Sequence, residues 1–371
     1  MEKMNKRPQN RVFFLLLLLL VLCLAISAGC NEAPARQEDK GDPGNNQPDK
    51  KEVDITDSLG ESITLPYPLE RVVVLNSNAA EAIRILEAQE AIIGIADSLL
   101  DEVYLGLDDR ELVGKYNRPS YEKILELRPQ AVFAYEKSYS DEDFSAKLEP
   151  LGIKVVKLNL YKPESYDDEL RMLAKAFGKE QRAEDFIAWK KQKTDLLADR
   201  IEDLGSRDPV SVLAIYTSDF AKGNYKTFAQ NTSTHQGIEL AGGKNIAGDM
   251  EGYPQVNGEW ILEQNPQIFV LNTSGKVEMG YDVSDPTWSK DVVARARKDA
   301  LISKTDAGKN AQIYLLYNKL LSGDKTYIGA FYLAKWFYPD CFRDIDPELI
   351  LQEYFEEWIG VPLQGIWSYK E

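Results

Sequence analysis

Two stretches of the chain repeat one sequence pattern, and this repeat constrains the fold more than any other feature. Residues 120–133 read S-Y-E-K-I-L-E-L-R-P-Q-A-V-F, and residues 257–270 read N-G-E-W-I-L-E-Q-N-P-Q-I-F-V. The matching positions are Glu122 and Glu259, Ile124 and Ile261, Leu125 and Leu262, Glu126 and Glu263, Pro129 and Pro266, and Gln130 and Gln267. Matches at a single spacing of 137 positions favour two lobes of similar build over a chance likeness of two helix starts.

Each copy of the repeat predicts a short helix followed by a buried strand. Ser120 and Asn257 are good N-cap residues, because their side-chain oxygens can accept hydrogen bonds from the free N–H groups of the first turn. The Ile-Leu pair of each copy is expected to face inward. Pro129 and Pro266 end the helices, because proline clashes with the preceding turn. The apolar run after each Pro-Gln pair is typical of a strand.

Glu122 and Glu259 occupy the second helical position of the two predicted helices. The helix dipole favours an acid there by about 0.3–1 kcal/mol, which is a sufficient structural reason for both residues. The functional alternative is a pair of outward-facing carboxylates, one on each lobe, that bind the same partner.

The N-terminus has the features of a secretion signal. Four basic residues precede an apolar run at residues 12–26, which is shorter than the ~20 residues that a membrane-spanning helix needs. The run ends in S-A-G-C at residues 27–30, which resembles the lipobox of bacterial lipoproteins, although Ser27 stands where that pattern prefers leucine. We therefore predict a signal peptide at residues 1–29 and lipidation of Cys30. The alternative is ordinary signal-peptidase cleavage, which would release a free secreted protein.

Charge and cysteine content narrow the possible partners. Removal of residues 1–29, which hold four basic residues and one acid, changes the formal net charge from −16 to −19. Such an acidic chain is not expected to bind nucleic acid, whose binders need basic faces. It is also not expected to lie flat on anionic lipid, so membrane attachment would rest on the lipid anchor. Cys23 leaves with the signal and Cys30 is the anchor site, so no intrachain disulfide is expected. Aromatic neighbours predict that Cys341 is a buried, small apolar residue.

The rest of the chain is expected to form a tether, two lobes and a helical connector. Residues 30–52 are polar and nearly free of apolar side chains, which predicts a disordered tether. Strand-like and helix-like segments alternate through residues 53–165 and again through residues 208–371. This alternation predicts two α/β lobes, each with a mostly parallel central sheet flanked by helices.

The connector between the lobes covers residues 166–207. Its residues 180–204 contain neither Gly nor Pro, so they predict one long rigid helix of roughly 37 Å that separates the lobes. Residues 326–338 and 347–358 predict amphipathic helices, and the helical spacing of their aromatic side chains favours packing in the core over contact with a ligand.

Four segments carry a resemblance to a known family: I-T-D-S-L-G at residues 55–60, P-L-E-R-V-V-V-L at residues 68–75, residues 119–132, and G-G-K-N-I-A at residues 242–247. From about residue 54 to the last helix, the chain resembles the cluster III solute-binding proteins of ABC importers, which handle ferric siderophores, haem and cobalamin. The resemblance implies two α/β lobes joined by one rigid helix, a ligand held in the cleft between them, and small opening motions.

The resemblance also implies a role for the two glutamates of the repeat. In this family one glutamate on each lobe docks against arginines of the permease, and Glu122 and Glu259 match those positions. Carboxylate–arginine pairs suit docking because they are bidentate and directional. The expected partners are an ABC permease with its ATPase, a metal-chelate ligand and, through the lipid anchor, the membrane; the protein itself is expected to be a monomer.

Ligands of such folds bind outside the carboxyl ends of the strands, so residues just after those ends are candidates for ligand binding. They are Asn76, Ser77 and Tyr135 in the first lobe and Tyr216 and Tyr225 in the second. Tyr116 matches a place where family members often put an aromatic residue against the ligand, and Arg118 and Lys137 could meet an anionic chelate. Tyrosine suits a large flat or amphipathic chelate, being apolar on its face and polar at its tip. The alternative is that these are ordinary loop residues.

We therefore predict an extracytoplasmic, lipid-anchored binding protein that captures an iron chelate, with a corrinoid or haem as alternative ligands. An enzyme on the same scaffold and a surface adhesin are alternatives of other classes, but the sequence holds no G-x-S-x-G, H-E-x-x-H or C-x-x-C motif. No catalytic residue, bound metal or intrinsic cofactor is expected. The single histidine, His235, could be a haem ligand, but a polar residue at a helix terminus is the stronger interpretation.

Overall fold

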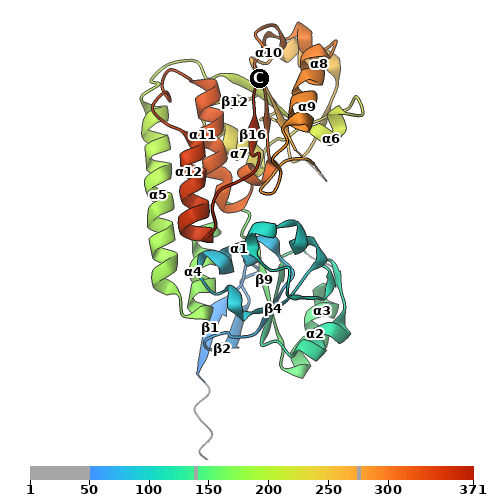
Figure 1. The fold of residues 1–371 in the computed structure, drawn as a ribbon, viewed down its shortest axis with the longest axis vertical. Coiled ribbons are helices and arrows are strands. Elements are labelled where there is room, and N and C mark those ends of the chain that lie inside the picture. The colour runs from blue at the N-terminus through green and yellow to red at the C-terminus, as the bar shows by residue number, and fades with distance from the viewer. Residues whose placement is uncertain (1–50, 138–140, 274–276) are drawn as a thin grey trace, which may run out of the picture. The chain divides into compact units, whose positions relative to one another are not determined.

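Two five-stranded sheets form the framework of the described chain (Figure 1). The first has the order β5–β4–β3–β8–β9, and all its strands run parallel: β3 (Val72–Val74), β4 (Ile92–Ile95), β5 (Glu111–Leu112), β8 (Ala131–Tyr135) and β9 (Lys154–Leu158). The second has the order β12–β10–β14–β15–β16, and only β16 is antiparallel: β10 (Ser211–Tyr216), β12 (Lys244–Asn245), β14 (Ile268–Asn272), β15 (Ile313–Leu316) and β16 (Ser368–Tyr369). The predicted fold class is therefore confirmed.

The computed structural model describes residues 51–137, 141–273 and 277–371, which lie within one compact unit, Asp49–Glu371. The predicted signal peptide, the lipidation site Cys30 and nearly all of the predicted tether lie outside the described residues. Within those ranges, no helix combines the length and the apolar character needed to cross a bilayer.

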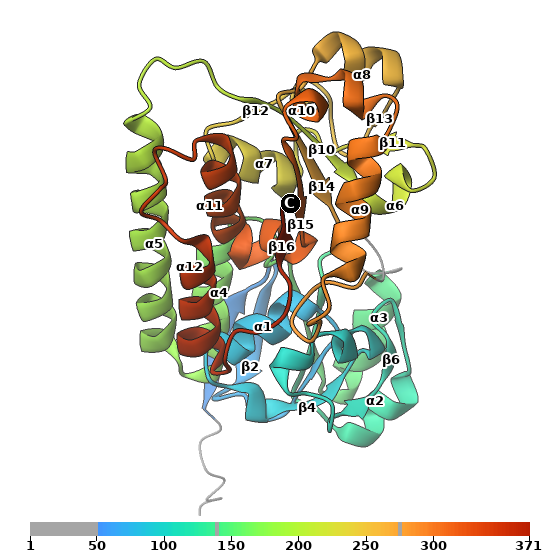
Figure 2. The ribbon, with the colours of Figure 1, turned by 45° about the horizontal axis from the view of Figure 1, so that its top comes forward.

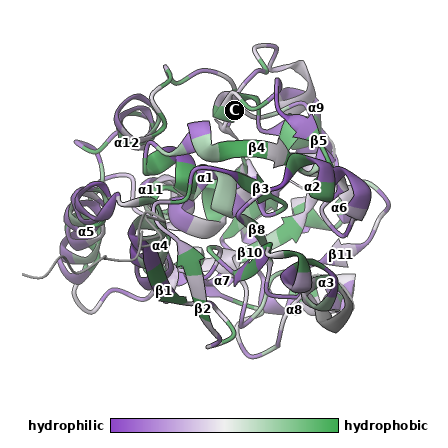
Figure 3. Cartoon of the chain, turned by 90° about the horizontal axis from the view of Figure 1, so that it is seen from below, coloured by the Kyte–Doolittle hydropathy of each residue, from purple (hydrophilic) through white to green (hydrophobic). Residues whose placement is uncertain are grey.

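Helices flank both sheets, and short antiparallel ribbons lie beside them. The helices of the first half are α1 (Ser77–Ile85), α2 (Tyr121–Leu127), α3 (Asp141–Leu148) and α4 (Tyr166–Phe177). Those of the second half are α6 (Thr217–Phe220), α7 (Ser233–Leu240), α8 (Gly258–Gln264), α9 (Thr287–Lys298), α10 (Asp306–Lys309), α11 (Thr326–Phe337) and α12 (Pro347–Glu353). The ribbons pair β1 (Glu52–Thr56) with β2 (Ser62–Pro66), β6 (Gly114–Lys115) with β7 (Arg118–Pro119), and β11 (Tyr225–Lys226) with β13 (Gln255–Val256). Figure 3 shows hydrophobic colours on β3 and β8, which are covered by the helices.

A single helix, α5 (Glu180–Glu202), connects the two halves, as the sequence predicted. Its 23 residues correspond to roughly 35 Å. Two ion pairs hold α5 to its neighbours. Glu184 of α5 contacts Arg171 of α4, and Lys193 of α5 contacts Glu353 at the end of α12. The C-terminal helices α11 and α12 run alongside α5 (Figures 1 and 2), so the connector is braced along its length.

The C-terminal segment reaches back to the first half of the chain. A π-helical turn at Tyr354–Ile359 follows α12 and packs against α1. Arg84 of α1 donates from Nε to the carbonyl of Ile359 at 2.8 Å, and Arg182 of α5 donates to the carbonyl of Glu357 at 2.6 Å. The two halves are therefore joined by packed and hydrogen-bonded elements as well as by α5.

The two copies of the repeat fold in the same way. Ser120 accepts a hydrogen bond from the N–H of Lys123 at the start of α2, and Asn257 accepts one from the N–H of Trp260 at the start of α8. Each helix ends at a residue with left-handed backbone, at φ 48° and φ 43°, before the proline. Parallel strands β8 and β14 follow, so the local prediction is confirmed in both halves.

One part of that local prediction is wrong. Ile124 and Ile261 are fully buried, but Leu125 is 38% exposed and Leu262 is 39% exposed. Neighbouring residues of a helix point about 100° apart, so a one-sided helix that buries the isoleucine turns the next residue toward solvent. In α2 the second inward contact comes from Leu127, which packs partly buried against the core.

Helix α11 differs from its predicted amphipathic character, because 11 of its 12 residues are buried. It packs against α7, α12 and α5, and a helix covered on all sides has no need for a polar face. The assignment of its aromatic residues to the core is correct. Cys341 follows in a turn that reaches the surface and is only partly buried; Arg207 donates to its Sγ at 3.3 Å, so the prediction of a buried apolar cysteine is wrong.

Candidate functional site

A cavity of about 1200 Å³ lies between the two halves of the chain. Its volume exceeds the roughly 300–1,000 Å³ typical of pockets for drug-sized ligands. Residues after the carboxyl ends of several parallel strands line it: Ser77 after β3, Tyr135 and Glu136 at the end of β8, and Tyr317 after β15. The ends of parallel strands meet at one edge of a sheet, so the topology itself builds this site.

Eight aromatic side chains line the described part of the cavity wall. They are Tyr104, Tyr116, Tyr135, Tyr161, Tyr281, Trp288, Tyr317 and Trp367. Several are held by other aromatic rings: Tyr281 stacks on Phe355 with ring centroids 5.5 Å apart, and Trp367 lies 5.1 Å from the same ring. The wall therefore offers apolar ring faces together with phenolic hydroxyl groups.

Three predicted ligand-binding residues come together at this wall. The hydroxyl groups of Ser77 and Tyr135 lie 2.9 Å apart, and the rings of Tyr116 and Tyr135 meet edge to face with centroids 5.6 Å apart. Lys137, the cation considered for an anionic chelate, also lines the cavity and is exposed. These residues lie where a ligand in the cavity would touch them.

Asn76 and Arg118 are placed differently. Asn76 is fully buried and caps α1, because its Oδ1 accepts from the N–H groups of Asn78 and Ala79 while its Nδ2 donates to the carbonyl of Leu158. It therefore positions the start of α1 and is absent from the cavity lining. Arg118 lies exposed on β7 and is also absent from the lining.

Tyr216 belongs to an aromatic cluster in the second half, whereas Tyr225 lies on β11 and pairs with Val256 of β13. Tyr216 packs on Phe228 with ring centroids 4.1 Å apart, and burial raises its pKa. Lys226 places its ammonium group over the ring of Tyr216 at 5.5 Å and over that of Tyr253 at 5.7 Å. Neither Tyr216 nor Tyr225 belongs to the residues that line the cavity.

The strand-end rule missed several lining residues. Glu102 lies between the short 3-10 turns Asp97–Asp101 and Val103–Leu105, and Tyr104 belongs to the second turn. The sequence predicts only irregular or weakly helical structure in this region. Tyr317 directly follows β15, so the same rule applied to that strand would have found it. Lys319 and the segment 277–283 carry no sequence signal of their own.

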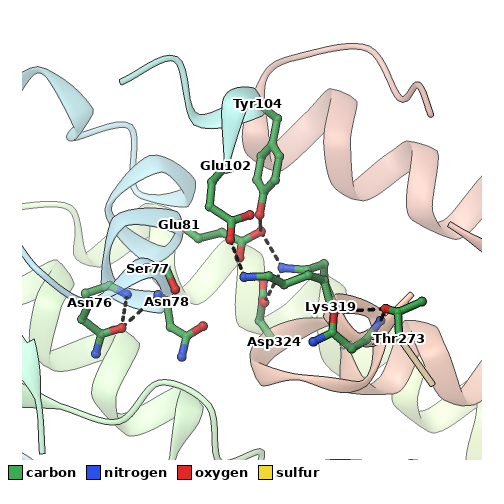
Figure 4. A network of polar contacts seen from close by, with 12 residues as sticks. Asn76, Ser77, Asn78, Glu81, Glu102, Tyr104, Thr273, Lys319 and Asp324 are labelled. Carbon is green, nitrogen blue, oxygen red and sulfur yellow. Dashed lines mark hydrogen bonds and ion pairs between the residues drawn. The ribbon is translucent and has the colours of Figure 1, made fainter. Parts of the chain in front are cut away.

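Behind Tyr104, a buried polar network joins the two halves (Figure 4). Lys325 places its Nζ 2.5 Å from Oε1 of Glu81 and 3.1 Å from Oδ1 of Asp324. Tyr104 and Tyr354 donate their hydroxyl hydrogens to the same Oε1 of Glu81, at 3.2 and 2.8 Å. Glu81 belongs to α1, whereas the lysine belongs to the turn Gly323–Lys325, so this network crosses between the lobes.

The charges of this network support one another. Burial alone would raise the pKa of Glu81, but Lys325, Tyr354 and Lys319 together outweigh burial and lower that pKa. Burial would likewise lower the pKa of Lys325, yet Asp324 and Glu81 together raise it. Burial raises the pKa of Asp324 above its ordinary value. The ammonium group therefore stays charged between two carboxyl groups.

A second cross-lobe ion pair lies in the cavity wall itself, between Lys319 and Glu102. Burial opposes the charge on Lys319, but Glu102 and Glu81 together outweigh burial and raise the pKa of the ammonium group. The charged lining residues in the described ranges are Asp101, Glu102, Glu136, Glu278 and Asp282 against Lys137 and Lys319. The described wall thus carries a surplus of acid, and one of its two lysines already has a carboxylate partner.

The described ranges hold no group of three or more His, Cys, Asp or Glu side chains arranged to bind a metal ion. His235 lies in α7, where its N–H donates to Thr232 and its Nδ1 is 3.1 Å from Nδ2 of Asn245. It is buried and does not belong to the cavity lining. Its contacts are those of a structural residue near a helix start.

Comparison with known proteins agrees with this architecture. A family model described as "Periplasmic binding protein" matches residues 72–320, which is more than half of the chain. The chain therefore belongs to the periplasmic binding protein family, the substrate-binding proteins of ABC transporters. Because this family consists of solute-binding proteins, the prediction that the chain is not an enzyme is confirmed, and so is its resemblance to the cluster III members.

Individual relatives are distant. A molybdate-binding protein, MolA, of Haemophilus influenzae is 24% identical over 332 residues, which cover 82% of this chain and 90% of the relative. A cobalamin-binding protein of Halobacterium salinarum is 27% identical over 225 residues, covering 59% and 58%. Among solved structures, a TroA-like periplasmic binding protein, FepB, of Veillonella parvula is similar with a TM-score of 0.74 at 24% identity, covering 86% of this chain and 99% of that one.

Proposed function

We propose that the protein is an extracytoplasmic lipoprotein, anchored through Cys30, that captures a ferric siderophore in the cavity and delivers it to the permease of its importer. The observation that carries this proposal is the cavity of about 1200 Å³, with eight aromatic side chains in the part of its wall that the structure describes. Aromatic faces bury the apolar periphery of a large chelate, and phenolic hydroxyl groups bind its polar atoms.

The charge of the wall supports a particular kind of chelate. The described lining has five carboxylates and two ammonium groups, so it favours a neutral or cationic ligand and repels a multiply charged anion. A small oxyanion would need convergent N–H and cationic donors, and Lys319 is already paired with Glu102. The Haemophilus influenzae relative is named as a molybdate-binding protein. Molybdate is such a small oxyanion and therefore suits this cavity poorly.

A corrinoid is the second candidate ligand. The cavity volume suits a large macrocycle, and the matching relative of Halobacterium salinarum is named as a cobalamin-binding protein. Haem is a third possibility in size, but His235, the single histidine, does not line the cavity. An iron ligand from histidine is therefore not available to haem in this wall.

The proposed delivery step uses Glu122 and Glu259, which are exposed in the first turns of α2 and α8. One carboxylate on each lobe, paired with an arginine of the permease, would fix orientation as well as contact. Ligand release would follow when the permease moves the lobes apart.

Calorimetric titration tests the proposal. The panel contains a ferric hydroxamate, a ferric catecholate, a cobalamin, haemin and molybdate. We expect one-to-one saturable heat with the hydroxamate, and we expect Tyr116→Ala to weaken that binding by about tenfold or more. Tyr253→Ala is the matched control, because Tyr253 is 52% exposed against 41% for Tyr116 but lies outside the cavity lining. Saturation by the cobalamin alone would favour the second candidate, and saturation by molybdate alone would contradict the proposal.

A further inference from the structure

The helices of the repeat each present the same exposed side chains. On α2 they are Glu122, Leu125 and Glu126, and on α8 they are Glu259, Leu262 and Glu263. We call each set an acid–leucine face. Residues at positions i, i+3 and i+4 lie on one side of a helix, so each leucine lies beside the two carboxylates of its own face.

The carboxylates of the two acid–leucine faces have no structural role in the described part of the fold. In the described part of the chain, none of the four carboxylates forms an ion pair or a hydrogen bond with another residue. The nearest basic neighbour in sequence, Lys123, donates instead to the carbonyl of Leu112 at 2.7 Å. The sheet side of each helix is already filled by Ile124 or Ile261.

A lone exposed leucine is ordinary on a protein surface. Here two leucines have almost equal exposure, 38% and 39%, at equivalent positions of a repeat that folds the same way in both lobes. Each is flanked by unpaired acid. The same surface occurring twice on one chain fits a partner that also carries one surface twice.

We infer that the two acid–leucine faces form the docking surface for the permease, with Leu125 and Leu262 as apolar anchors and Glu126 and Glu263 as additional charges. The inference rests on the proposed docking role of Glu122 and Glu259 and extends it. The partner surface is basic, contains an apolar depression, and occurs once on each half of the permease. Burial of a leucine in such a depression strengthens binding, whereas the carboxylates set the orientation of the protein on the permease.

Photocross-linking of the full lipidated chain in its own cells tests where the permease lies. A benzophenone side chain replaces Leu125 or Leu262 in separate variants, and Leu196 or Leu349 in control variants on α5 and α12. The controls are 37% and 58% exposed. We expect adducts with the same integral membrane permease from positions 125 and 262 but not from the controls. Adducts from neither position, or equal adducts from the controls, would overturn the inference.

Affinity measurements then test the anchor role. The permease with its ATPase is placed in nanodiscs, and its affinity for the full chain is compared between Leu125→Ala/Leu262→Ala and Leu196→Ala/Leu349→Ala. We expect the first pair to weaken docking by about tenfold or more and the second to change it less than about twofold. Titration with a ferric hydroxamate and a cobalamin shows whether the cavity is unchanged. Unchanged docking of the first pair would refute the anchor role, whereas failure of every ligand to bind would count only against the proposed ligand.

Discussion

The Nζ of Lys325 lies 2.5 Å from Oε1 of Glu81, and this buried contact joins the two lobes. Lys325 is 2% exposed and Glu81 is 6% exposed. A buried charge of this kind is stable only while its partner is in place. The contact therefore helps to fix the relative position of α1 and the turn Gly323–Lys325 beside the cavity wall.

Replacement of Lys325 should destabilise the protein strongly. Lys325→Met leaves Glu81 and Asp324 buried without their cation, and breaking a buried pair in this way costs about 3–5 kcal/mol of the free energy of unfolding. Denaturant unfolding measures this change. Arg343→Ala, which removes an exposed ion pair with Asp340, is the control and should cost no more than about 1 kcal/mol. An equal decrease in the free energy of unfolding of the two variants would show that the buried ion pair stabilises the fold no more than an exposed one.

The same network predicts a dependence of stability on alkaline pH. The pKa of Lys325 lies above its ordinary value of 10.5, mainly because Asp324 and Glu81 outweigh burial. A raised pKa means that this contribution is complete below pH 10.5 and is lost as the pH rises through the folded-state value. Burial also raises the pKa of Tyr354 and Tyr104 above 10.0, which acts in the same direction.

Unfolding free energies between about pH 9 and pH 12 test this sign. The wild-type value should fall with rising pH, and the fall should be shallower in Lys325→Met by about 1.4 kcal/mol per pH unit above the ordinary lysine pKa. A steeper fall in the variant would show that the lysine is not the group that titrates.

Gln130 and Gln267 should stabilise their lobes in the same way as each other, because the side-chain oxygen of each accepts hydrogen bonds from backbone N–H groups. Gln130 accepts from the N–H groups of Glu70 and Arg71 at 2.7 and 2.9 Å, and Gln267 accepts from the N–H of Ser211 at 2.8 Å. Each tie fixes the start of the neighbouring parallel strand. Gln130→Ala or Gln267→Ala should each lower the free energy of unfolding by about 1 kcal/mol. Gln192→Ala, which changes an exposed residue of α5, is the control and should stay within about 0.5 kcal/mol.

Charge reversal at the docking glutamates should separate delivery from capture. Glu122→Lys/Glu259→Lys should abolish uptake into cells and leave ligand affinity unchanged, because neither residue lines the cavity. Glu180→Lys/Glu348→Lys is a matched control, since both residues are exposed acids in the first turn of a helix. A loss of ligand affinity in the first variant, or equal loss of uptake in the control, would argue against a docking role.

The fold was largely predictable from the sequence because its signals are local. N-caps, prolines and apolar runs specify α2 and β8 and their copies α8 and β14 within a few residues. The long helix α5 followed from the absence of Gly and Pro and ended within two residues of its expected end. Ser77 and Tyr135 reached the cavity wall because strand ends of a parallel sheet gather at one edge.

The rest of the site depends on contacts between distant segments. Glu81 and Lys325 are 244 positions apart, and nothing local marks either as a partner of the other. Asn76 follows a strand end just as Ser77 does, but its side chain caps α1 and turns away from the cavity. Tyr216 follows the same rule in the second lobe, yet packing on Phe228 holds it in another cluster.

The most direct test of ligand binding in the cavity is a titration with a ferric hydroxamate, followed by tryptophan fluorescence in three proteins. Trp288 lies in the cavity wall, whereas Trp336 of α11 is stacked on Tyr314 outside the lining, with ring centroids 4.5 Å apart. Trp367 also lines the cavity, so we predict saturable quenching in the wild type that is reduced in Trp288→Phe and unchanged in Trp336→Phe. Quenching that survives Trp288→Phe and disappears in Trp336→Phe would contradict binding in this cavity.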